Sequence, residues 1–179
     1  MGYTVSELSD IQLIRDTAHR YCRGVDRLDA DEMRSAYWPD AIDDHGVFVG
    51  NAMEFVDRVI RSHDRWRATM HCILNHHIEL DGDGIGAKGE IYNVTYLFHT
   101  EGNAMDTWWG RYLDRYEQRD GVWRIAHRVC VHECTRAYGS GDPMPIPVEL
   151  FRQGSFDRAA DGRPIGPSRS ASRGQSRMR

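Results

Sequence analysis

The chain has 179 residues, of which 40% are hydrophobic and 28% are charged, and its formal net charge is −4. This length suits one folded domain followed by a tail. The acidic balance argues against a basic nucleic-acid surface, and the sequence contains neither a signal-peptide pattern nor a run of about 18 apolar residues. We therefore expect a cytoplasmic protein with no nucleic-acid or membrane partner.

Helical patterns fill the N-terminal third of the sequence. Thr4 opens a capping box, and apolar residues at intervals of three and four then predict a helix that runs to about Asp26. Asp29 begins a second, short helix, which Pro39 stops. Asn51 caps a third helix with an apolar stripe.

The pattern changes to strands in the rest of the domain. Residues 41–50 predict two short extended pieces around His45. From Ala68 onward, β-branched and aromatic runs alternate with turn sequences. The long strands are expected at 68–80, 85–100, 104–118 and 122–138.

Three helices followed by long strands predict an α+β fold, in which a cone-shaped, curved antiparallel sheet wraps around the N-terminal helices and leaves a pocket. Gly89 and Gly110 are candidates for the bulges that such curvature needs. Residues 1–140 form this domain. Residues 141–179 form a C-terminal extension that is partly docked, and its Arg-rich end, 161–179, is expected to be disordered.

Five polar side chains in otherwise apolar runs are the candidate site residues: Tyr21, Asp26, His71, Arg128 and His132. A neutral imidazole is a competent base near pH 7, and a carboxylate bonded to its second nitrogen fixes its tautomer. His71 and Asp26 can therefore remove a proton from carbon. Tyr21, Arg128 and His132 can stabilise the charge that develops on a leaving group.

These residues also have structural interpretations. A histidine in an apolar strand is often a hydrogen-bonded core residue, an aspartate at a helix end is often a cap, and a tyrosine on an apolar face usually belongs to the core. Arg128 can pair with Glu133 or Asp114. Histidines 71, 76 and 77 with Cys72 are metal-capable by type, but neighbouring strand residues face opposite ways, so we expect no metal. The sequence has no P-loop and no G-x-G-x-x-G after a strand, which disfavours a nucleotide cofactor.

The order of elements, together with Tyr21-x-x-x-x-Asp26, Thr69-Met70-His71 and the sequence RDGVWR at 119–124, resembles the nuclear-transport-factor-2-like (NTF2-like) superfamily. More narrowly, it resembles the SnoaL-like branch, which includes lindane dehydrochlorinase, scytalone dehydratase and bile-acid 7α-dehydratase. The resemblance covers residues 5–140. It implies that His71 is the catalytic base, Asp26 its acidic partner and Tyr21 a site tyrosine, with Arg128 or His132 assisting departure.

The resemblance also implies a cofactor-free, cone-shaped barrel and a trimer. The function we predict is a cofactor-independent lyase, dehydratase-like or formaldehyde-releasing, acting on a hydrophobic cyclic or aromatic small molecule. A ketosteroid-isomerase-like or polyketide-cyclase-like enzyme is the alternative among enzymes, and a non-catalytic small-molecule-binding module is the alternative from another class.

A homo-oligomer is expected, and a trimer is favoured. Trp123, Ile125, Val129 and Val131 alternate with the proposed pocket-facing residues, so the last strand has two apolar faces where a monomer needs one. The outer face of the sheet is then buried between subunits.

Overall fold

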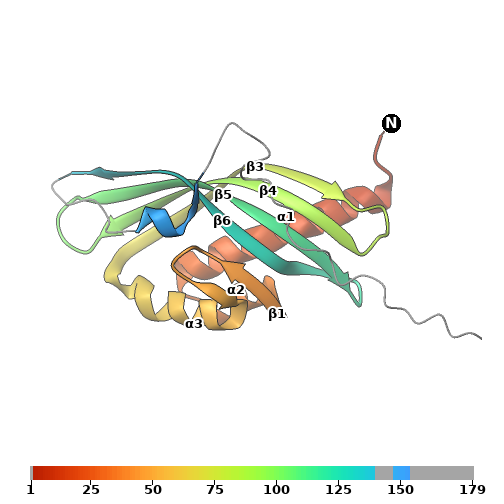
Figure 1. The fold of residues 1–179 in the computed structure, drawn as a ribbon, viewed down its shortest axis with the longest axis horizontal. Helices are drawn as coiled ribbons and strands as arrows, with labels where there is room; N and C mark the ends of the chain where they lie inside the picture. Colours follow the sequence, from red (N-terminus) through yellow and green to blue (C-terminus); the bar gives the residue numbers. More distant parts are fainter. Residues whose placement is uncertain (1, 140–146, 154–179) are drawn as a thin grey trace, which may run out of the picture.

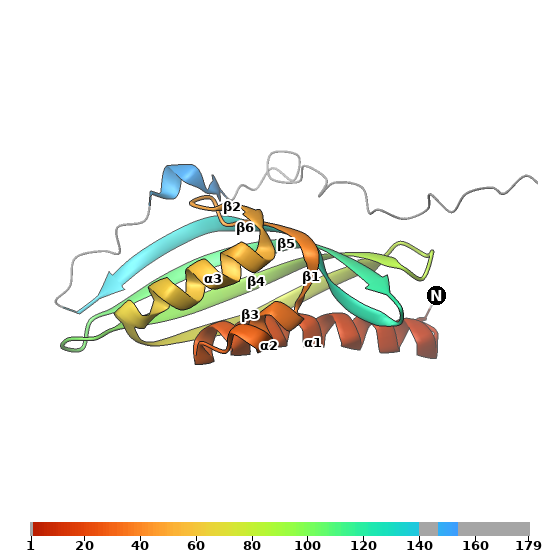
Figure 2. The same ribbon diagram turned by 90° about the horizontal axis from the view of Figure 1, so that it is seen from below.

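The computed structural model describes residues 2–139 and 147–153, and it places three helices on one side of a long, curved sheet (Figures 1 and 2). Helix α1 (Val5–Arg27) begins at the predicted capping box, in which Thr4 and Glu7 bond reciprocally. Helix α2 (Ala30–Ser35) is capped by Asp29, and helix α3 (Ala52–Ser62) by Asn51. Each side chain accepts a hydrogen bond from a backbone N–H that the helix leaves free.

The strands of the sheet are β1 (Tyr37–Asp44), β2 (Val49–Asn51), β3 (Trp66–Leu80), β4 (Gly86–His99), β5 (Met105–Arg119), β6 (Val122–Tyr138) and β7 (Arg152–Gln153). Their order is β2-β1-β6-β5-β4-β3, and β7 pairs with β6. The predicted long strands match β3 to β6 to within two residues at each end. The α+β prediction is confirmed, but the sheet is mixed, because β1 pairs with β6 in parallel. Helix α3 carries the chain back along the sheet before β3 begins (Figure 2).

The second helix ends earlier than Pro39, which instead lies inside β1. The residue before a proline favours extended backbone, so the chain is already a strand when it reaches Pro39. Pairing of β1 with β6 supplies the long-range partner for this extended stretch, which the sequence pattern did not reveal.

The main core lies between α1, α2, α3 and the concave face of the sheet. Ile14, Ala18, Tyr21 and Val25 form the buried stripe of α1, and all are at most 2% exposed. This stripe follows the helical period, so the apolar spacing in the sequence fixes which face of α1 meets the sheet. No helix in the described part of the chain is long and apolar enough to span a membrane.

A bulge changes which side chains of β6 face outward. The register between β5 and β6 shifts between Arg115 and Tyr116, which inverts the alternation along β6. Trp123 and Ile125 therefore belong to the main core, whereas Val129 and Val131 form a separate cluster with Leu113. The prediction that all four β6 residues share the outer face is wrong for Trp123 and Ile125.

The two glycines proposed as bulge positions have different roles. Gly110 lies opposite a bulge, because Trp109 pairs with Cys134 and Gly110 with His132, so a bulge is present at this point but its extra residue is in β6. A Cβ at Gly110 would come within 2.4 Å of the Val131 carbonyl oxygen. Gly89 pairs without a shift, and the prediction of a bulge there is wrong. Its hydrogen side chain is required because a Cβ would lie 2.7 Å from the Tyr116 ring.

Part of the C-terminal extension lies against the domain. The short helix η2 (Val148–Leu150) precedes β7, and the buried Phe151 between them packs its ring 5.0 Å from that of Trp108. The segment 161–179, which was predicted to be disordered, lies outside the described residues.

Candidate active site

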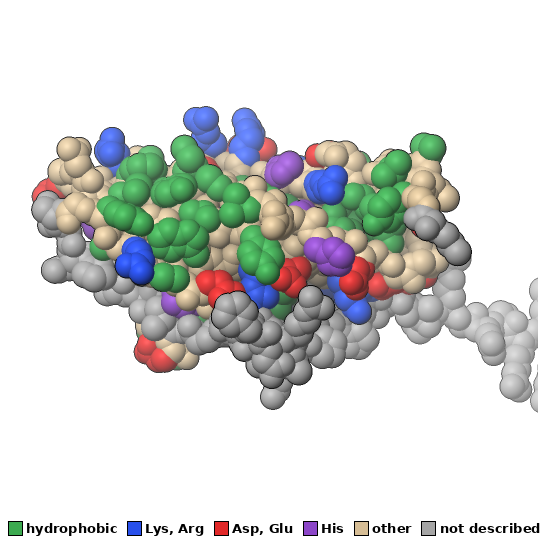
Figure 3. All heavy atoms as spheres, turned by 90° about the horizontal axis from the view of Figure 1, so that it is seen from above, with side chains coloured by type: hydrophobic (Ala, Val, Ile, Leu, Met, Phe, Trp, Pro, Cys, Tyr) green, Lys and Arg blue, Asp and Glu red, His purple; other side chains and the backbone are tan. Residues whose placement is uncertain are grey.

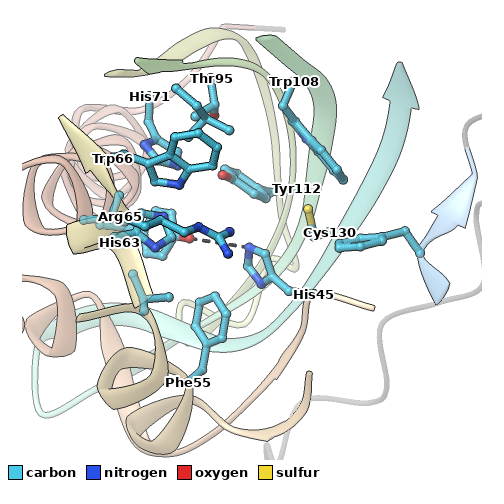
Figure 4. Close-up of a pocket in the computed structure, with 15 residues that line it drawn as sticks. His45, Phe55, His63, Arg65, Trp66, His71, Thr95, Trp108, Tyr112 and Cys130 are labelled. Atoms are coloured by element: carbon cyan, nitrogen blue, oxygen red, sulfur yellow. Dashed lines mark hydrogen bonds between the residues drawn. The ribbon is translucent and has the colours of Figure 1, made fainter. Parts of the chain in front are cut away.

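A cavity of about 140 Å³ opens between the helices and the concave face of the sheet (Figure 4). Helices α1 and α3 contribute aliphatic side chains, the sheet contributes rings, and the short helix η1 (His63–Arg65) lies at one wall. The apolar part of the lining includes Val25, Val59, Leu97, Trp108, Tyr112 and Phe151. A hydrophobic cavity with a few polar groups is the usual form of a small-molecule site.

Asp26 and His71 form a hydrogen-bonded pair at this cavity. Asp26 lies in the last turn of α1, and His71 lies on β3, which packs against that helix. Nδ1 of His71 is 2.6 Å from Oδ1 of Asp26. A carboxylate only accepts hydrogen bonds, so Nδ1 carries the proton and Nε2 is left as the basic nitrogen of the neutral ring.

The Asp26 carboxylate receives two further hydrogen bonds. The Thr69 hydroxyl donates to Oδ1 at 2.8 Å, and the His71 backbone N–H donates to Oδ2 at 2.8 Å. Burial raises the pKa of Asp26, but the hydrogen bonds and positive charge of His71, together with the Thr69 hydroxyl, outweigh it and lower the pKa below its usual value. Asp26 is thus ionised and held in one orientation.

Tyr21 lies one turn and a half before Asp26 on α1 and also lines the cavity. Its ring centroid is 6.4 Å from that of His71, and its hydroxyl is 3.5 Å from Nε2 of His45 (Figure 4, dashed line). Burial raises the pKa of Tyr21 well above its usual value, so the hydroxyl stays protonated and can donate. The structure thus brings together three of the five predicted site residues, Tyr21, Asp26 and His71.

A second histidine–aspartate pair lines the same cavity, and the sequence interpretation missed it. Nδ1 of His45 bonds to Oδ1 of Asp43, while the Tyr37 hydroxyl donates to Oδ2 at 2.6 Å. Asp43 is near the end of β1, and a tight turn in which Asp44 accepts from the Gly46 N–H fixes His45 directly after the strand. The spacing Asp43-x-His45 was the available signal, since residues two apart share a strand face.

The pKa of His45 is raised to about 10. Burial lowers it, but the Asp43 carboxylate and the Cys130 thiol favour the charged ring and together outweigh burial. Asp43 is 0% exposed, so water does not weaken this attraction. His45 is therefore an imidazolium at neutral pH.

Arg128 lies behind the cavity wall. Its guanidinium is 0% exposed and makes two hydrogen bonds of 2.7 Å to Asp114, with its Cζ 4.2 Å from the Tyr21 ring and 4.0 Å from the Tyr112 ring. Burial lowers the pKa of Arg128, but the charge of Asp114 outweighs burial and raises it above its usual value. The predicted ion pair with Asp114 is confirmed, and the guanidinium is separated from the cavity by the two tyrosines it supports.

His132 also lies outside the set of residues that line the cavity. Its ring centroid is 4.6 Å from that of Trp108, and Nε2 is 3.0 Å from the Thr135 hydroxyl. His132 thus packs behind Trp108, which does face the cavity.

The wall formed by η1 adds two residues that the sequence did not single out. His63 and Arg65 both line the cavity. Burial, with the nearby charges of His71 and Arg65, lowers the pKa of His63 to about 4, so this ring is neutral at pH 7. Within the part of the chain that the structure describes, no group of three His, Cys, Asp or Glu side chains is arranged to hold a metal ion.

Solved structures with the same fold cover most of the chain. A scytalone dehydratase candidate from Novosphingobium aromaticivorans aligns with a TM-score of 0.68 at 18% identity, over 81% of this chain and 98% of its own. A type 2 hexachlorocyclohexane dehydrochlorinase (LinA) aligns with a TM-score of 0.68 at 20% identity, over 80% and 97%. Likeness at these identities shows a shared fold.

A third structure, the type 3 LinA dehydrochlorinase from Novosphingobium barchaimii, aligns with a TM-score of 0.64 at 22% identity, over 79% of this chain and 94% of its own. The comparison with curated proteins gives no match. The sequence model of the SnoaL-like domain matches residues 6–129, which include the Asp26–His71 pair. The chain therefore belongs to the SnoaL-like family of the NTF2-like superfamily, as its motifs indicated.

Proposed function

We propose that this protein is a cofactor-independent lyase that removes a proton and a neighbouring leaving group from a hydrophobic cyclic or aromatic small molecule. His71 is the base and Asp26 orients it. The tyrosine hydroxyl of Tyr21 donates to the reacting molecule. The names of the structural neighbours, a dehydratase candidate and two dehydrochlorinases, describe eliminations and support this reaction class.

The observation that carries the proposal is the geometry of the Asp26–His71 pair. The 2.6 Å contact at Nδ1 fixes the tautomer in which Nε2 holds a free lone pair. The ionised carboxylate also stabilises the imidazolium that forms once Nε2 has taken a proton. A base of this kind, in a cavity walled by rings, suits the removal of a weakly acidic C–H proton.

Exchange of carbon-bound hydrogen with deuterium tests the base and does not depend on the identity of the natural substrate. Cyclic and aromatic ketones, with and without a β-hydroxyl group, are incubated with the protein in D₂O and followed by proton NMR. We expect deuterium to enter the α-carbon, and the β-hydroxy compounds to lose water as well. In the His71→Gln variant both reactions should slow by about 10²- to 10⁴-fold, because general-base catalysis typically contributes this factor.

His77→Gln is the matched control, since His77 lies on the same strand with its side chain 72% exposed. It should react like the wild type. Exchange without loss of water would favour the isomerase-like alternative, and tight binding with neither reaction would favour the binding module. Equal rates in His71→Gln and His77→Gln would remove His71 from the mechanism.

We further propose a homo-oligomer, with a trimer favoured, that covers the outer face of the sheet. Hydrophobic side chains gather on this face (Figure 3), and Met70, Leu74 and Tyr92 are 52%, 56% and 45% exposed. Exposed apolar patches often mark contact surfaces. Light scattering on the purified chain measures the assembly directly, and a monomer at micromolar concentration would contradict the proposal.

A further inference from the structure

The two histidine–aspartate pairs face one cavity from different elements. In Figure 4, His71 lies near the top of the cavity and His45 lies below it. Tyr21 lies between them, because its ring is 6.4 Å from His71 and its hydroxyl is 3.5 Å from Nε2 of His45. A molecule bound in this cavity can therefore contact His71 with one of its atoms and His45 with another.

The surroundings of His45 fix both its orientation and its charge. Its ring stacks on Phe55 at 4.3 Å with an angle of 21° between the planes, and Nδ1 is held by the fully buried Asp43. With Nδ1 engaged by Asp43, Nε2 is the ring nitrogen on the cavity side, where its neighbour is the Tyr21 hydroxyl at 3.5 Å. The titratable groups that face the ring come from five elements: Asp43 on β1, Cys130 on β6, Tyr21 on α1, Tyr112 on β5 and His63 on η1.

Among these neighbours Asp43 is the carboxylate, and the guanidinium of Arg65 also lines the cavity. Burial keeps Tyr21 and Tyr112 protonated by raising the pKa of each, and it keeps His63 neutral by lowering its pKa to about 4. The Arg128 cation is screened from His45 by the two tyrosine rings and is paired with Asp114. The imidazolium of His45 is thus balanced by Asp43 at Nδ1, and its Nε2–H lies at the cavity 3.5 Å from the Tyr21 hydroxyl, a long contact that a bound oxygen can replace.

We propose that His45, held by Asp43, is the acid that protonates an oxygen leaving group while His71 removes a proton from the adjacent carbon. This inference rests on the proposed lyase function and narrows its substrate class. The substrate is an alcohol with its hydroxyl on the carbon next to an acidified C–H group, as in a β-hydroxy ketone.

The proton and electron balance of this step is complete. Nε2 of His71 takes the proton from carbon, and the electron pair of that C–H bond forms the new C=C bond. The C–O bond breaks, its electron pair stays on oxygen, and this oxygen takes the proton from Nε2 of His45 and leaves as water. His71 then returns its proton to solvent and His45 regains one, so neither an oxidant nor a cofactor is consumed.

The charge on His45 bears on which leaving group departs, water or halide, a choice that the sequence did not decide. Hydroxide is a poor leaving group because water has a pKa of about 15.7, so departure of a hydroxyl gains from a proton donor. A halide leaves as a stable anion and needs no proton. An imidazolium fixed opposite the base therefore favours loss of water over loss of halide.

The proton state of His45 is measured first, on the full chain labelled with ¹⁵N-histidine and titrated by NMR. We expect the imidazolium signal of His45 to persist beyond pH 9 in the wild type. It should be lost at lower pH in Asp43→Asn, while the neighbouring Asp44→Asn variant should resemble the wild type. A neutral His45 ring at pH 7 would overturn the proposal.

The acid role is then tested with two probes that share one carbon skeleton, 3-hydroxycyclohexanone and 3-chlorocyclohexanone, with the uncatalysed rates subtracted. His45→Gln should lower kcat for the hydroxy ketone by about 100-fold or more and kcat for the chloro ketone by less than about tenfold. His77→Gln should change neither. The ratio of the two rates corrects for any loss of folded protein, since misfolding lowers both equally.

The outcomes distinguish this inference from the function on which it rests. If His71→Gln stops both probes and His45→Gln slows both by the same factor, the lyase function stands and the acid role of His45 is wrong. If the wild type converts neither probe nor any ketone of the deuterium-exchange panel, the lyase function fails and the role of His45 fails with it.

Discussion

The two histidine–aspartate pairs are built from the same side chains, but the surroundings of their carboxylates differ. At the first pair, the Asp26 carboxylate accepts from Thr69, from the His71 backbone and from the His71 ring. At the second, Asp43 is fully buried and accepts from Tyr37 and His45. Burial and the number of hydrogen-bond donors, rather than residue type, distinguish the two carboxylates.

This difference suits opposite tasks. A carboxylate that accepts from three donors, one of them the backbone of the same histidine, fixes the orientation of that histidine, which suits a base. A carboxylate sealed from water keeps its histidine charged, which an acid requires. On the mechanism proposed above, one cavity holds both a base and an acid, as pairs of titratable groups in divergent environments do elsewhere.

We expect the largest effect from a variant that breaks the Asp26–His71 pair. Asp26→Asn keeps the shape of the side chain but removes its charge, so it no longer fixes the Nδ1–H tautomer of His71. We expect kcat to fall by about 10³- to 10⁴-fold with little change in KM, because the carboxylate acts mainly when the imidazolium forms. Steady-state kinetics on the hydroxy ketone measure the loss.

Asp29→Asn is the control for this variant. Asp29 caps α2 through its side-chain oxygen, and asparagine caps a helix equally well. Activity and thermal stability should both be retained. If Asp26→Asn unfolds the protein instead of reducing kcat, then Asp26 is a structural residue and the pair is not a catalytic unit.

The next largest effect is a loss of stability when Arg128, which supports the tyrosines beside His45, is replaced. Arg128 contacts the rings of Tyr21 and Tyr112, and its removal in Arg128→Met leaves Asp114 buried without its partner. We expect the free energy of unfolding to fall by about 3–5 kcal/mol, the usual cost of breaking a buried ion pair. Urea denaturation measures this loss. Arg119→Met, at a partly exposed ion pair, should cost about 1 kcal/mol or less.

The variants Arg128→Met and His132→Gln compare the two residues that the sequence offered for assisting departure of the leaving group. Arg128→Met should also lower kcat of the folded fraction more than His132→Gln does, since Arg128 contacts the ring of Tyr21 and His132 packs behind Trp108. We treat Arg128 as a positioning residue. The reverse order of effects would transfer the role to His132.

The smallest expected effect is the pH dependence that the Asp43–His45 pair gives to the rate and to the stability. With a pKa of about 10 for His45, the rate of water loss should fall as the pH rises through about 10, and Asp43→Asn should move this decline to lower pH. Because the folded pKa lies above the unfolded value of about 6.5, the pair stabilises the fold fully below about pH 6.5 and loses that contribution as the pH rises through about 10.

Rates and urea denaturation between about pH 6 and pH 10.5 measure both effects, a range that spans the unfolded and folded pKa values of the ring. Asp44→Asn is the matched control and should keep the wild-type profile, since the side-chain oxygen of asparagine can still accept from the Gly46 N–H of the turn. A decline at the same pH in Asp43→Asn and in the wild type would show that a group other than His45 sets the alkaline limb.

Local patterns were sufficient to predict the elements of this protein. The period of apolar residues located α1 and its buried face, and caps at Asp29 and Asn51 began the next two helices. Turn sequences bounded β3 to β6 within two residues. The motif that joins Asp26 to His71 selected two side chains that the structure places 2.6 Å apart, although 45 residues separate them in the chain.

What the sequence alone determined is therefore the fold class and the first pair, because both follow from spacing along the chain and from a motif. The tertiary structure decided the rest. A bulge in β6 turned Trp123 and Ile125 inward, and an ion pair with Asp114 placed Arg128 behind two tyrosines. The charge of His45 depends on the complete burial of Asp43, which β1 attains only by pairing in parallel with a strand more than 80 residues away. Burial is a property of the assembled fold, and no local pattern encodes it.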